Sequence, residues 1–173
     1  MANGIKTVCI DSCVVISLLK EGRDRLDKSD IPVLKGLLSD IHSGKIHVFF
    51  PTILRTEILE CNIGKKLMAE FDLWTALPNF DEVPVNSRVA KTAAKIRSYY
   101  SEKNRINEEI PKLALADCIF IATAIENDCP VLYTYDGDRL KPSKQKKLLS
   151  LKSPIAEEYP LQIQKPDAFQ LGM

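Results

Sequence analysis

The sequence predicts an α/β domain with a mainly parallel sheet. Short β-rich apolar runs alternate with helical patterns along the chain, and parallel strands need crossover helices between them. Several of the runs end in an acidic residue. The chain has 173 residues, of which 45% are hydrophobic and 27% charged, as in a globular domain with a real core. Because no repeat or linker divides the sequence, we expect a single domain over residues 1–173.

The first predicted elements are a strand and a helix joined by an acid. Ile5–Ile10 (IKTVCI) is a β-rich run that ends at Asp11, and the following SCVVISLLK has a helical pattern that Asp11 or Ser12 would cap. A second helix is expected over residues 29–44, with Pro32 at a first-turn position and apolar residues on one face.

The next segment repeats the order of strand, acid and helix. Ile46–Phe50 (IHVFF) is a strand closed by Pro51, and Thr52 caps a helix that carries Glu57. Lys65–Ala76 is expected to form a further helix, and FDEVPV a short extended piece.

Two helices are predicted in the second half of the chain. Asn86 or Ser87 caps the first, whose apolar residues recur at helical spacing, and the polar stretch Ser101–Glu109 is expected to be a loop. Pro111 then opens a helix that is apolar almost all round and has one charged residue, Asp117.

The last predicted strands lie in the final quarter of the chain. CPVLYTYDGD gives a short strand that ends in acids, and LQI is the last expected strand. The tail from about residue 141 extends the domain, either as a helix, a dimer contact or a partner-binding arm. In parallel sheets, ligands bind beyond the carboxyl ends of the strands, where Asp11 and Asp136 fall.

Charge and composition set limits on location and partners. A net charge of +1 gives no global basic field, so any nucleic-acid binding must rest on a local patch. The start lacks the pattern of a signal peptide and no apolar run reaches bilayer length, so we expect a cytosolic protein without membrane contact. Five cysteines without a C-x-x-C pair are expected to be reduced packing residues.

Asp117 needs a partner, because an isolated ionised carboxylate in apolar surroundings is strongly disfavoured. Its neighbours at helical spacing are not cationic, so the partner must come from elsewhere in the fold. A divalent ion shared with Asp11, Glu57 and Asp136 would serve, because Mg²⁺ and Mn²⁺ prefer carboxylate and water oxygens. Such an ion beside a phosphate supports phosphodiester hydrolysis.

These residues resemble the PIN-domain family of metal-dependent nucleases, and especially its toxin-type (VapC-like) ribonucleases. The resemblance runs through VCIDSCVV, PTILRTEILE and LALADCIFIATAIENDCPVLYTYD. It implies a three-layer α/β/α sandwich, a Mg²⁺ or Mn²⁺ site and single-stranded RNA as substrate. The acids it matches to that site are Asp11, Glu57, Asp117 and Asp136, with Asp138 as the competing fourth acid.

Neighbouring polar residues are secondary candidates. By the same resemblance, the hydroxyls of Ser12 and Thr134 orient a carboxylate or a water. Cys13 departs from the family pattern, because a thiol is a poor hydrogen-bonding group where Asn or Ser is usual. Basic residues that could line a phosphate path are Arg55, Arg88, Lys91, Lys95 and Arg139.

Three of the four acids also have a structural interpretation, whereas the apolar surroundings of Asp117 favour a functional one. Asp11 could serve merely as a helix cap, Asp136 could merely make a turn, and Glu57 could be a solvated helix residue.

The leading hypothesis is an endoribonuclease, which by resemblance is the toxin of a toxin–antitoxin pair and a homodimer silenced by an antitoxin. A non-toxin nuclease of RNA processing is the near alternative. A non-catalytic α/β domain that binds a metal or a basic ligand is the alternative from another class.

Overall fold

The computed structural model describes residues 5–20, 28–107, 110, 112–136, 148–151 and 159–167. Its centre is a five-stranded sheet in the order β3-β2-β1-β4-β5, in which every pair of neighbours is parallel. The strands are β1 (Lys6–Ile10), β2 (Ile46–Pro51), β3 (Phe80–Val83), β4 (Val131–Tyr133) and β5 (Gln162–Gln164). The predicted parallel α/β sheet is therefore confirmed.

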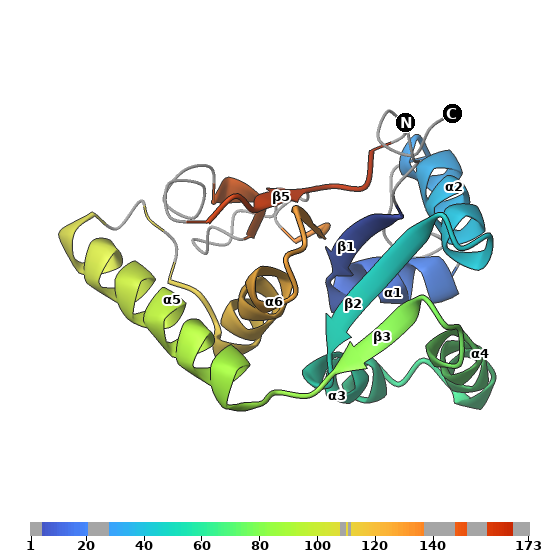
Figure 1. Ribbon diagram of the computed structural model, residues 1–173, viewed down its shortest axis with the longest axis horizontal. Helices are drawn as coiled ribbons and strands as arrows, with labels where there is room; N and C mark the ends of the chain where they lie inside the picture. The colour runs from blue at the N-terminus through green and yellow to red at the C-terminus, as the bar shows by residue number, and fades with distance from the viewer. Residues whose placement is uncertain are drawn as a thin grey trace.

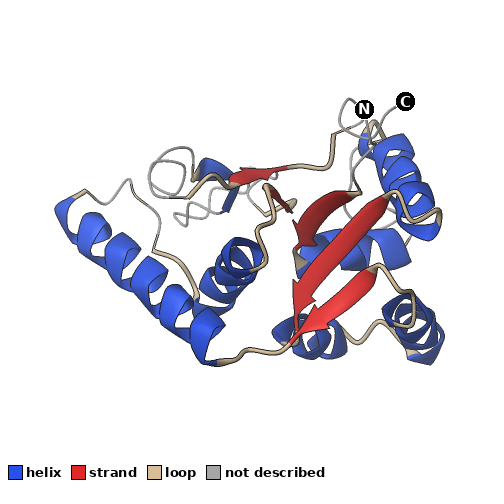
Figure 2. Cartoon of the chain, in the orientation of Figure 1, coloured by secondary structure: helices blue, strands red, loops and turns tan. Residues whose placement is uncertain are grey.

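Helices cover both faces of the sheet and make a three-layer sandwich (Figure 1). They are α1 (Ser12–Leu19), α2 (Asp30–His42), α3 (Ile53–Glu60), α4 (Lys65–Thr75), α5 (Ser87–Ile106) and α6 (Leu115–Glu126), with a 3-10 turn at Leu148–Ser150. Helix α6 packs on β1 and β2, and α5 packs on α6, whereas α1 contacts α2, α3 and α4 on the other side (Figure 2).

The core explains the apolar character of α6. Every residue from Cys118 to Ala124 is buried, because the helix lies between the sheet and α5. Strand β1 is also central, and Val8, Cys9 and Ile10 have no exposed surface. No helix in the described part of the chain is long and apolar enough to span a bilayer.

One predicted boundary is wrong. The stretch expected as a loop, Ser101–Glu109, continues α5 as far as Ile106. Its Glu, Lys and Arg residues are good helix formers, and Ser101 and Asn104 keep a half-buried side toward the protein. The Asn104 side-chain amide donates to the Ile110 carbonyl at 2.6 Å, which ties the last turn of the helix to Ile110.

The helix starts agree with the sequence in part. Asp11 caps α1 by accepting from the Ser12 amide, and Asn86 caps α5. Thr52 precedes α3 as expected, but its side chain makes no capping bond. Helix α6 begins at Leu115, and Pro111, the expected first residue, lies outside the described residues.

The cysteines differ in their surroundings. Cys9, Cys118 and Cys129 are buried, as expected of packing residues. Cys61 is exposed, so the expectation that all five pack in the core is wrong there. Cys13 is partly exposed and lies at the candidate site.

Candidate active site

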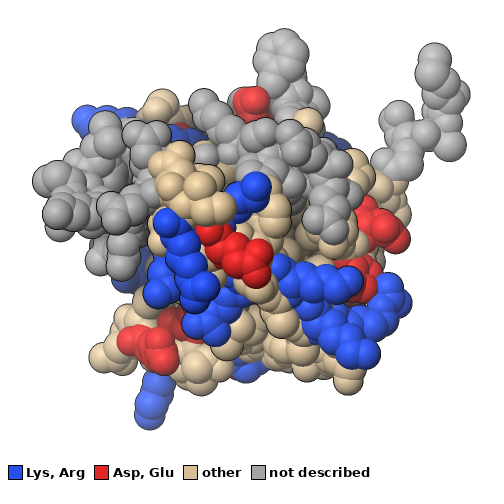
Figure 3. All heavy atoms as spheres, turned by 90° about the vertical axis from the view of Figure 1, so that its left-hand side faces the viewer, with Lys and Arg blue, Asp and Glu red and all other residues tan. Residues whose placement is uncertain are grey.

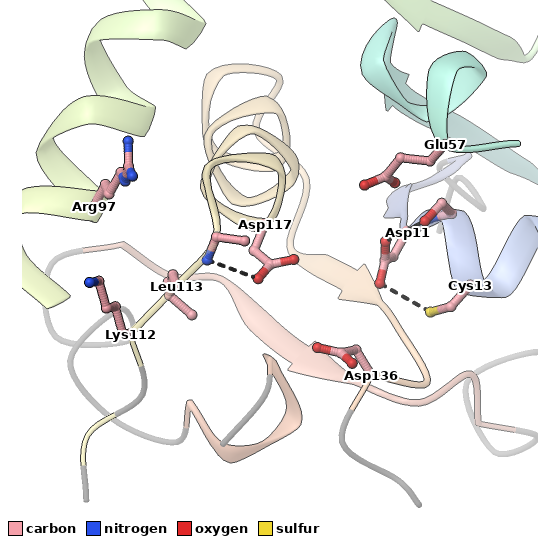
Figure 4. A pocket seen from close by; sticks show the side chains of 10 residues that line it. Asp11, Cys13, Glu57, Arg97, Lys112, Leu113, Asp117 and Asp136 are labelled. Atoms are coloured by element: carbon pink, nitrogen blue, oxygen red, sulfur yellow. Dashed lines mark hydrogen bonds between the residues drawn. The ribbon is translucent and has the colours of Figure 1, made fainter. Parts of the chain in front are cut away.

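Four acids from four elements line one cavity of about 580 Å³. Asp11 follows β1, Glu57 lies in α3, Asp117 in the first turn of α6, and Asp136 three residues after β4. The cavity thus lies where the carboxyl ends of the central strands meet, as expected for a parallel sheet. Figure 4 shows the carboxylates of Asp11, Glu57, Asp117 and Asp136 extending toward a shared space.

The Asp11 carboxylate is the most firmly held of the four. It is 6% exposed, and the Ser12 amide donates to Oδ1 at 2.6 Å. The Thr134 hydroxyl donates to Oδ2 at 2.6 Å, and the Cys13 thiol donates to the same oxygen at 3.0 Å. Burial raises the pKa of Asp11, and these three donors offset part of that rise.

Thr134 connects two of the acids. Its wholly buried hydroxyl donates to Asp11 and accepts from the Asp136 amide at 2.9 Å. Its backbone amide donates to the Gln164 carbonyl of β5 at 3.0 Å, so the side chain is fixed from the sheet. The predicted candidate hydroxyl therefore bridges the ends of β1 and β4.

Cys13 is better bonded than the sequence suggested. Besides its bond to Asp11, its sulfur accepts from the Tyr135 amide at 3.1 Å and lies 3.3 Å from the Thr134 hydroxyl oxygen. The thiol spans the gap between α1 and the segment after β4. Although a thiol is a weak hydrogen-bonding group, the Cys13 sulfur reaches partners on both sides of the gap at once.

We expect Thr134→Val to destabilise the protein by about 1.5–3 kcal/mol, because it removes a hydrogen bond to a charged, buried group while keeping the shape of the side chain. The loss should be larger at pH 8 than at pH 5, because the pKa of Asp11 rises further without that donor. Urea denaturation at both pH values measures this, with Thr134→Ser as the matched control. Equal stability of the Val and Ser variants would contradict the role given to this hydroxyl.

Glu57 presents a carboxylate oxygen without a described partner. Its Oε2 atom is fully buried and accepts no hydrogen bond from the described residues. Burial raises the pKa of Glu57, repulsion from Asp11 and Glu60 adds to the rise, and a hydrogen bond with Ser12 opposes it. A buried acceptor without a donor is a position where a cation or an ordered water fits.

Asp117 lies at the start of α6, and this position accounts for a lone acid in an apolar helix. The Ala114 amide donates to Asp117 Oδ2 at 3.3 Å, and the positive end of the helix dipole favours a carboxylate there. These contacts do not compensate the charge fully. Burial first, and then repulsion from Asp11, Asp136 and Glu57, raise the pKa of Asp117 to about 6.

The donor set fits a hard divalent cation. Mg²⁺ and Mn²⁺ take carboxylate oxygens, and the acids here raise one another's pKa for want of an opposite charge. In the described part of the chain, no three acidic, His or Cys side chains lie close enough to hold one ion directly. Mg²⁺ commonly keeps several waters and binds one or two carboxylates, so bridging waters or rotated side chains would complete such a site.

Among the described residues, the structure does not bring Arg55, Arg88, Lys91 or Lys95 to the cavity. The Arg55 guanidinium forms ion pairs with Glu82 and Asp72, at 2.8 and 2.9 Å. Arg88 pairs with Glu126 at 2.8 Å. Lys91 and Lys95 are exposed on α5 and do not line the cavity, and Asp138 and Arg139 lie outside the described residues.

Two other cations line the cavity, Arg97 and Lys112. Sequence reasoning missed Arg97 as a phosphate contact because it grouped Arg97 with Lys91 and Lys95 on one polar side of α5, and Lys112 carries no such local signal. Arg97 is two residues after Lys95, so its side chain lies about 200° around the helix from that of Lys95. The signal that could have found it is its place beside the buried stripe that includes Ala93, Ile96 and Tyr100.

The PIN domain family matches residues 8–144, well over half of the chain. This chain belongs to the PIN-domain family. PIN-domain proteins are nucleases, and the four acids all lie within the matched residues. No curated protein gave a significant match to the chain.

Solved structures share the PIN-domain fold. A chain of VapBC2 from Rickettsia felis bound to a DNA fragment from their promoter has a TM-score of 0.59 at 10% identity, over 93% of this chain and 99% of that one. A chain of FitAcB from Neisseria gonorrhoeae has a TM-score of 0.50 at 21% identity, over 75% of this chain and 87% of that one.

Proposed function

We propose that this PIN-domain protein is a metal-dependent endoribonuclease that hydrolyses phosphodiester bonds of single-stranded RNA. The observation that carries the proposal is the convergence of Asp11, Glu57, Asp117 and Asp136 on one cavity at the carboxyl ends of parallel strands. Mg²⁺ or Mn²⁺ held by these acids would polarise the phosphoryl oxygen and lower the pKa of an attacking water.

The surrounding residues support this chemistry by holding the acids in place. Ser12, Cys13 and Thr134 orient the Asp11 carboxylate and favour its ionised form. The Ala114 amide holds Asp117 Oδ2 and leaves Oδ1 without a partner in the described chain. With the pKa of Asp117 raised to about 6, this carboxyl gains and loses a proton near neutral pH in the metal-free protein.

We expect purified protein to cleave single-stranded RNA with Mn²⁺ or Mg²⁺, and to lose this activity in EDTA. EDTA should stop cleavage because it removes the ion that polarises the phosphate and activates the attacking water. Excess Mn²⁺ added after EDTA should restore cleavage, because it returns that ion to the acid cluster. Gel analysis of mixed single-stranded RNA, with double-stranded RNA and single-stranded DNA in parallel, measures activity and substrate class.

Three results would contradict the proposal, the last of them only in its substrate. Cleavage that persists in EDTA would remove the metal from the chemistry. Metal binding, measured by calorimetry, without cleavage of any of these nucleic acids would favour the non-catalytic metal-binding alternative. Preference for single-stranded DNA would keep the nuclease and change its substrate.

We further propose that the protein is the toxin of a toxin–antitoxin pair and forms a homodimer. The support is the likeness to chains from VapBC2 and FitAcB, both toxin–antitoxin complexes. An acidic cavity also suits an Arg or Lys from an inhibitory partner. Growth arrest on expression in a bacterial host, absent for Asp117→Asn, would separate a toxin from a nuclease of RNA processing, and light scattering would give the oligomeric state.

A further inference from the structure

We infer that Arg97 and Lys112 form a phosphate-binding wall, which holds an RNA phosphate beside the one that is cleaved. This inference rests on the proposed function and assigns a part of the same cavity to substrate binding. The starting observation is that the cavity has two chemically different sides. In Figure 4, Arg97 and Lys112 lie on one side of Asp117, whereas Asp11 and Glu57 lie on the other.

The two cations belong to separate elements that meet at the cavity. Arg97 projects from α5, and Lys112 lies in the extended segment that leads into α6. Leu113 is buried directly after Lys112, which fixes the backbone of this segment against the core. The wall is therefore held by the packing of α5 on α6 and does not depend on one long side chain alone.

Neither cation is neutralised by the described protein. Both side chains are exposed, and across the described ranges no carboxylate lies within ion-pair distance of Arg97 or Lys112. Arg88, on the same helix, forms a close pair with Glu126. The two cavity cations thus keep their charge for a ligand, although four acids line the same cavity.

A polyanionic substrate needs such a wall. RNA phosphates are repelled by a cavity lined with acids, and cations at its side offset that repulsion for the strand as it passes. Arg binds a phosphate through two parallel N–H bonds, and Lys acts as a point charge. Phosphate contacts of this kind fix the position of a strand without reading its bases.

The face that carries α5 is rich in basic side chains. Figure 3 shows the face that carries α5, where Lys and Arg side chains lie on both sides of a small group of acids. Arg88, Lys91 and Lys95 follow one edge of α5 at helical spacing, and Arg97 is on the other side of that helix. RNA would therefore contact the cavity edge of α5, which carries Arg97, and not the more basic edge.

The test measures binding of labelled single-stranded RNA by fluorescence anisotropy in Mg²⁺, using the full chain with Asp117→Asn so that the RNA survives. Adding Arg97→Gln or Lys112→Gln should weaken binding roughly tenfold each at low salt, as expected for one charge-assisted hydrogen bond. Each change should also make the slope of log affinity against log salt shallower by about 0.7. Lys91→Gln, the same kind of change on the outer edge of α5, should alter affinity less than about twofold.

A second readout uses the active chain. Arg97→Gln should raise KM for RNA more than it lowers kcat, because the contact is to a phosphate that does not react, and Arg97→Lys should recover part of the loss. Equal effects of Arg97→Gln and Lys91→Gln, or no effect of either cavity variant, would overturn the wall while leaving the nuclease intact. Failure of the Asp117→Asn chain to bind RNA at all would overturn the proposed function and the wall with it.

Discussion

Asp117→Asn is expected to abolish RNA cleavage, lowering kcat roughly a thousandfold or more, which corresponds to about 4 kcal/mol of lost transition-state stabilisation. Asp117 shares the cavity with Asp11, Glu57 and Asp136. An amide at this position has no charge with which to hold a cation, and it cannot take up a proton near neutral pH. The arrangement of the backbone should not change, because the Ala114 amide can donate to the Asn oxygen as it does to Asp117 Oδ2.

The same variant should be more stable than the wild type when metal is absent. At pH 7 the ionised Asp117 is disfavoured by burial and by the neighbouring acids, which raise its pKa from 3.8 to about 6. Such a rise corresponds to roughly 3 kcal/mol of destabilisation by the charged form, so we expect a gain of about 1–3 kcal/mol. A variant that loses activity and gains stability would show that the acid is kept for chemistry and not for folding.

Asp128→Asn is the matched control for this experiment. It makes the same chemical change at the other end of α6, on an exposed residue outside the cavity. The backbone φ of Asp128 is 51°, a left-handed conformation that Asn adopts as readily as Asp. The stability of this control, measured by urea denaturation in EDTA, and its rate of RNA cleavage in Mn²⁺ should both be close to those of the wild type. Normal cleavage by Asp117→Asn would sink the assignment of the four acids.

The order of the acids along the chain made much of the cavity predictable. In a parallel sheet the residue after each strand lies at the same edge, so Asp11 and Asp136 could be placed together once the strands were recognised. Asp117 was marked by its apolar surroundings. The structure adds the reason why an acid is tolerated there. The backbone amide of Ala114, at the start of the helix, donates a hydrogen bond to the Asp117 carboxylate.

The parts that were missed depend on contacts distant in sequence. Cys13 matters through the Tyr135 amide, which is 122 residues away, and no local pattern indicates that contact. The prediction that Arg55, Arg88, Lys91 and Lys95 line the cavity was wrong for a similar reason. The net charge of a helix face does not show that Glu126 neutralises Arg88, or that Arg97 lies on the cavity side. Only the packing of α5 on α6 decides which cations remain available.

Helix propensity explains why α5 extends beyond its predicted end. Ser101–Ile106 is polar enough to resemble a loop, yet it contains residues with good helix propensity and no Gly or Pro. A preceding helix that already buries Tyr100 extends through such residues, because propagation adds one hydrogen bond for each residue fixed. The extension has a functional consequence, since Asn104 in the added turn binds the carbonyl of Ile110, two residues before Lys112.

The metal-free protein is expected to lose stability as the pH rises from about 4 to 7, and Mn²⁺ should reverse that trend. The folded-state pKa values of Asp11, Glu57 and Asp117 all lie above their unfolded values. Between the two values the folded state binds more protons than the unfolded state, so the free energy of unfolding falls with rising pH. The stabilising contribution is complete below the unfolded pKa and is lost as the pH passes the folded pKa, about 6 for Asp117.

A bound ion changes the sign because it requires the ionised carboxylates, so its affinity grows as the acids lose their protons. At a free concentration about a hundred times its Kd, an ion bound only by the folded state adds roughly 2.7 kcal/mol. Urea denaturation from pH 4.5 to 8, in EDTA and in Mn²⁺, measures both trends. The difference in stability between wild type and Asp117→Asn in EDTA isolates the cavity from other titrating groups, such as Glu126, whose pKa is lowered by Thr92 and Arg88.

Ca²⁺ should stabilise the fold and support little cleavage. A double variant, Asp11→Asn with Asp136→Asn, should not gain stability from metal. If that double variant gained as much stability from Mn²⁺ as the wild type, the ion would bind elsewhere, and the cavity would lose its role as a metal centre.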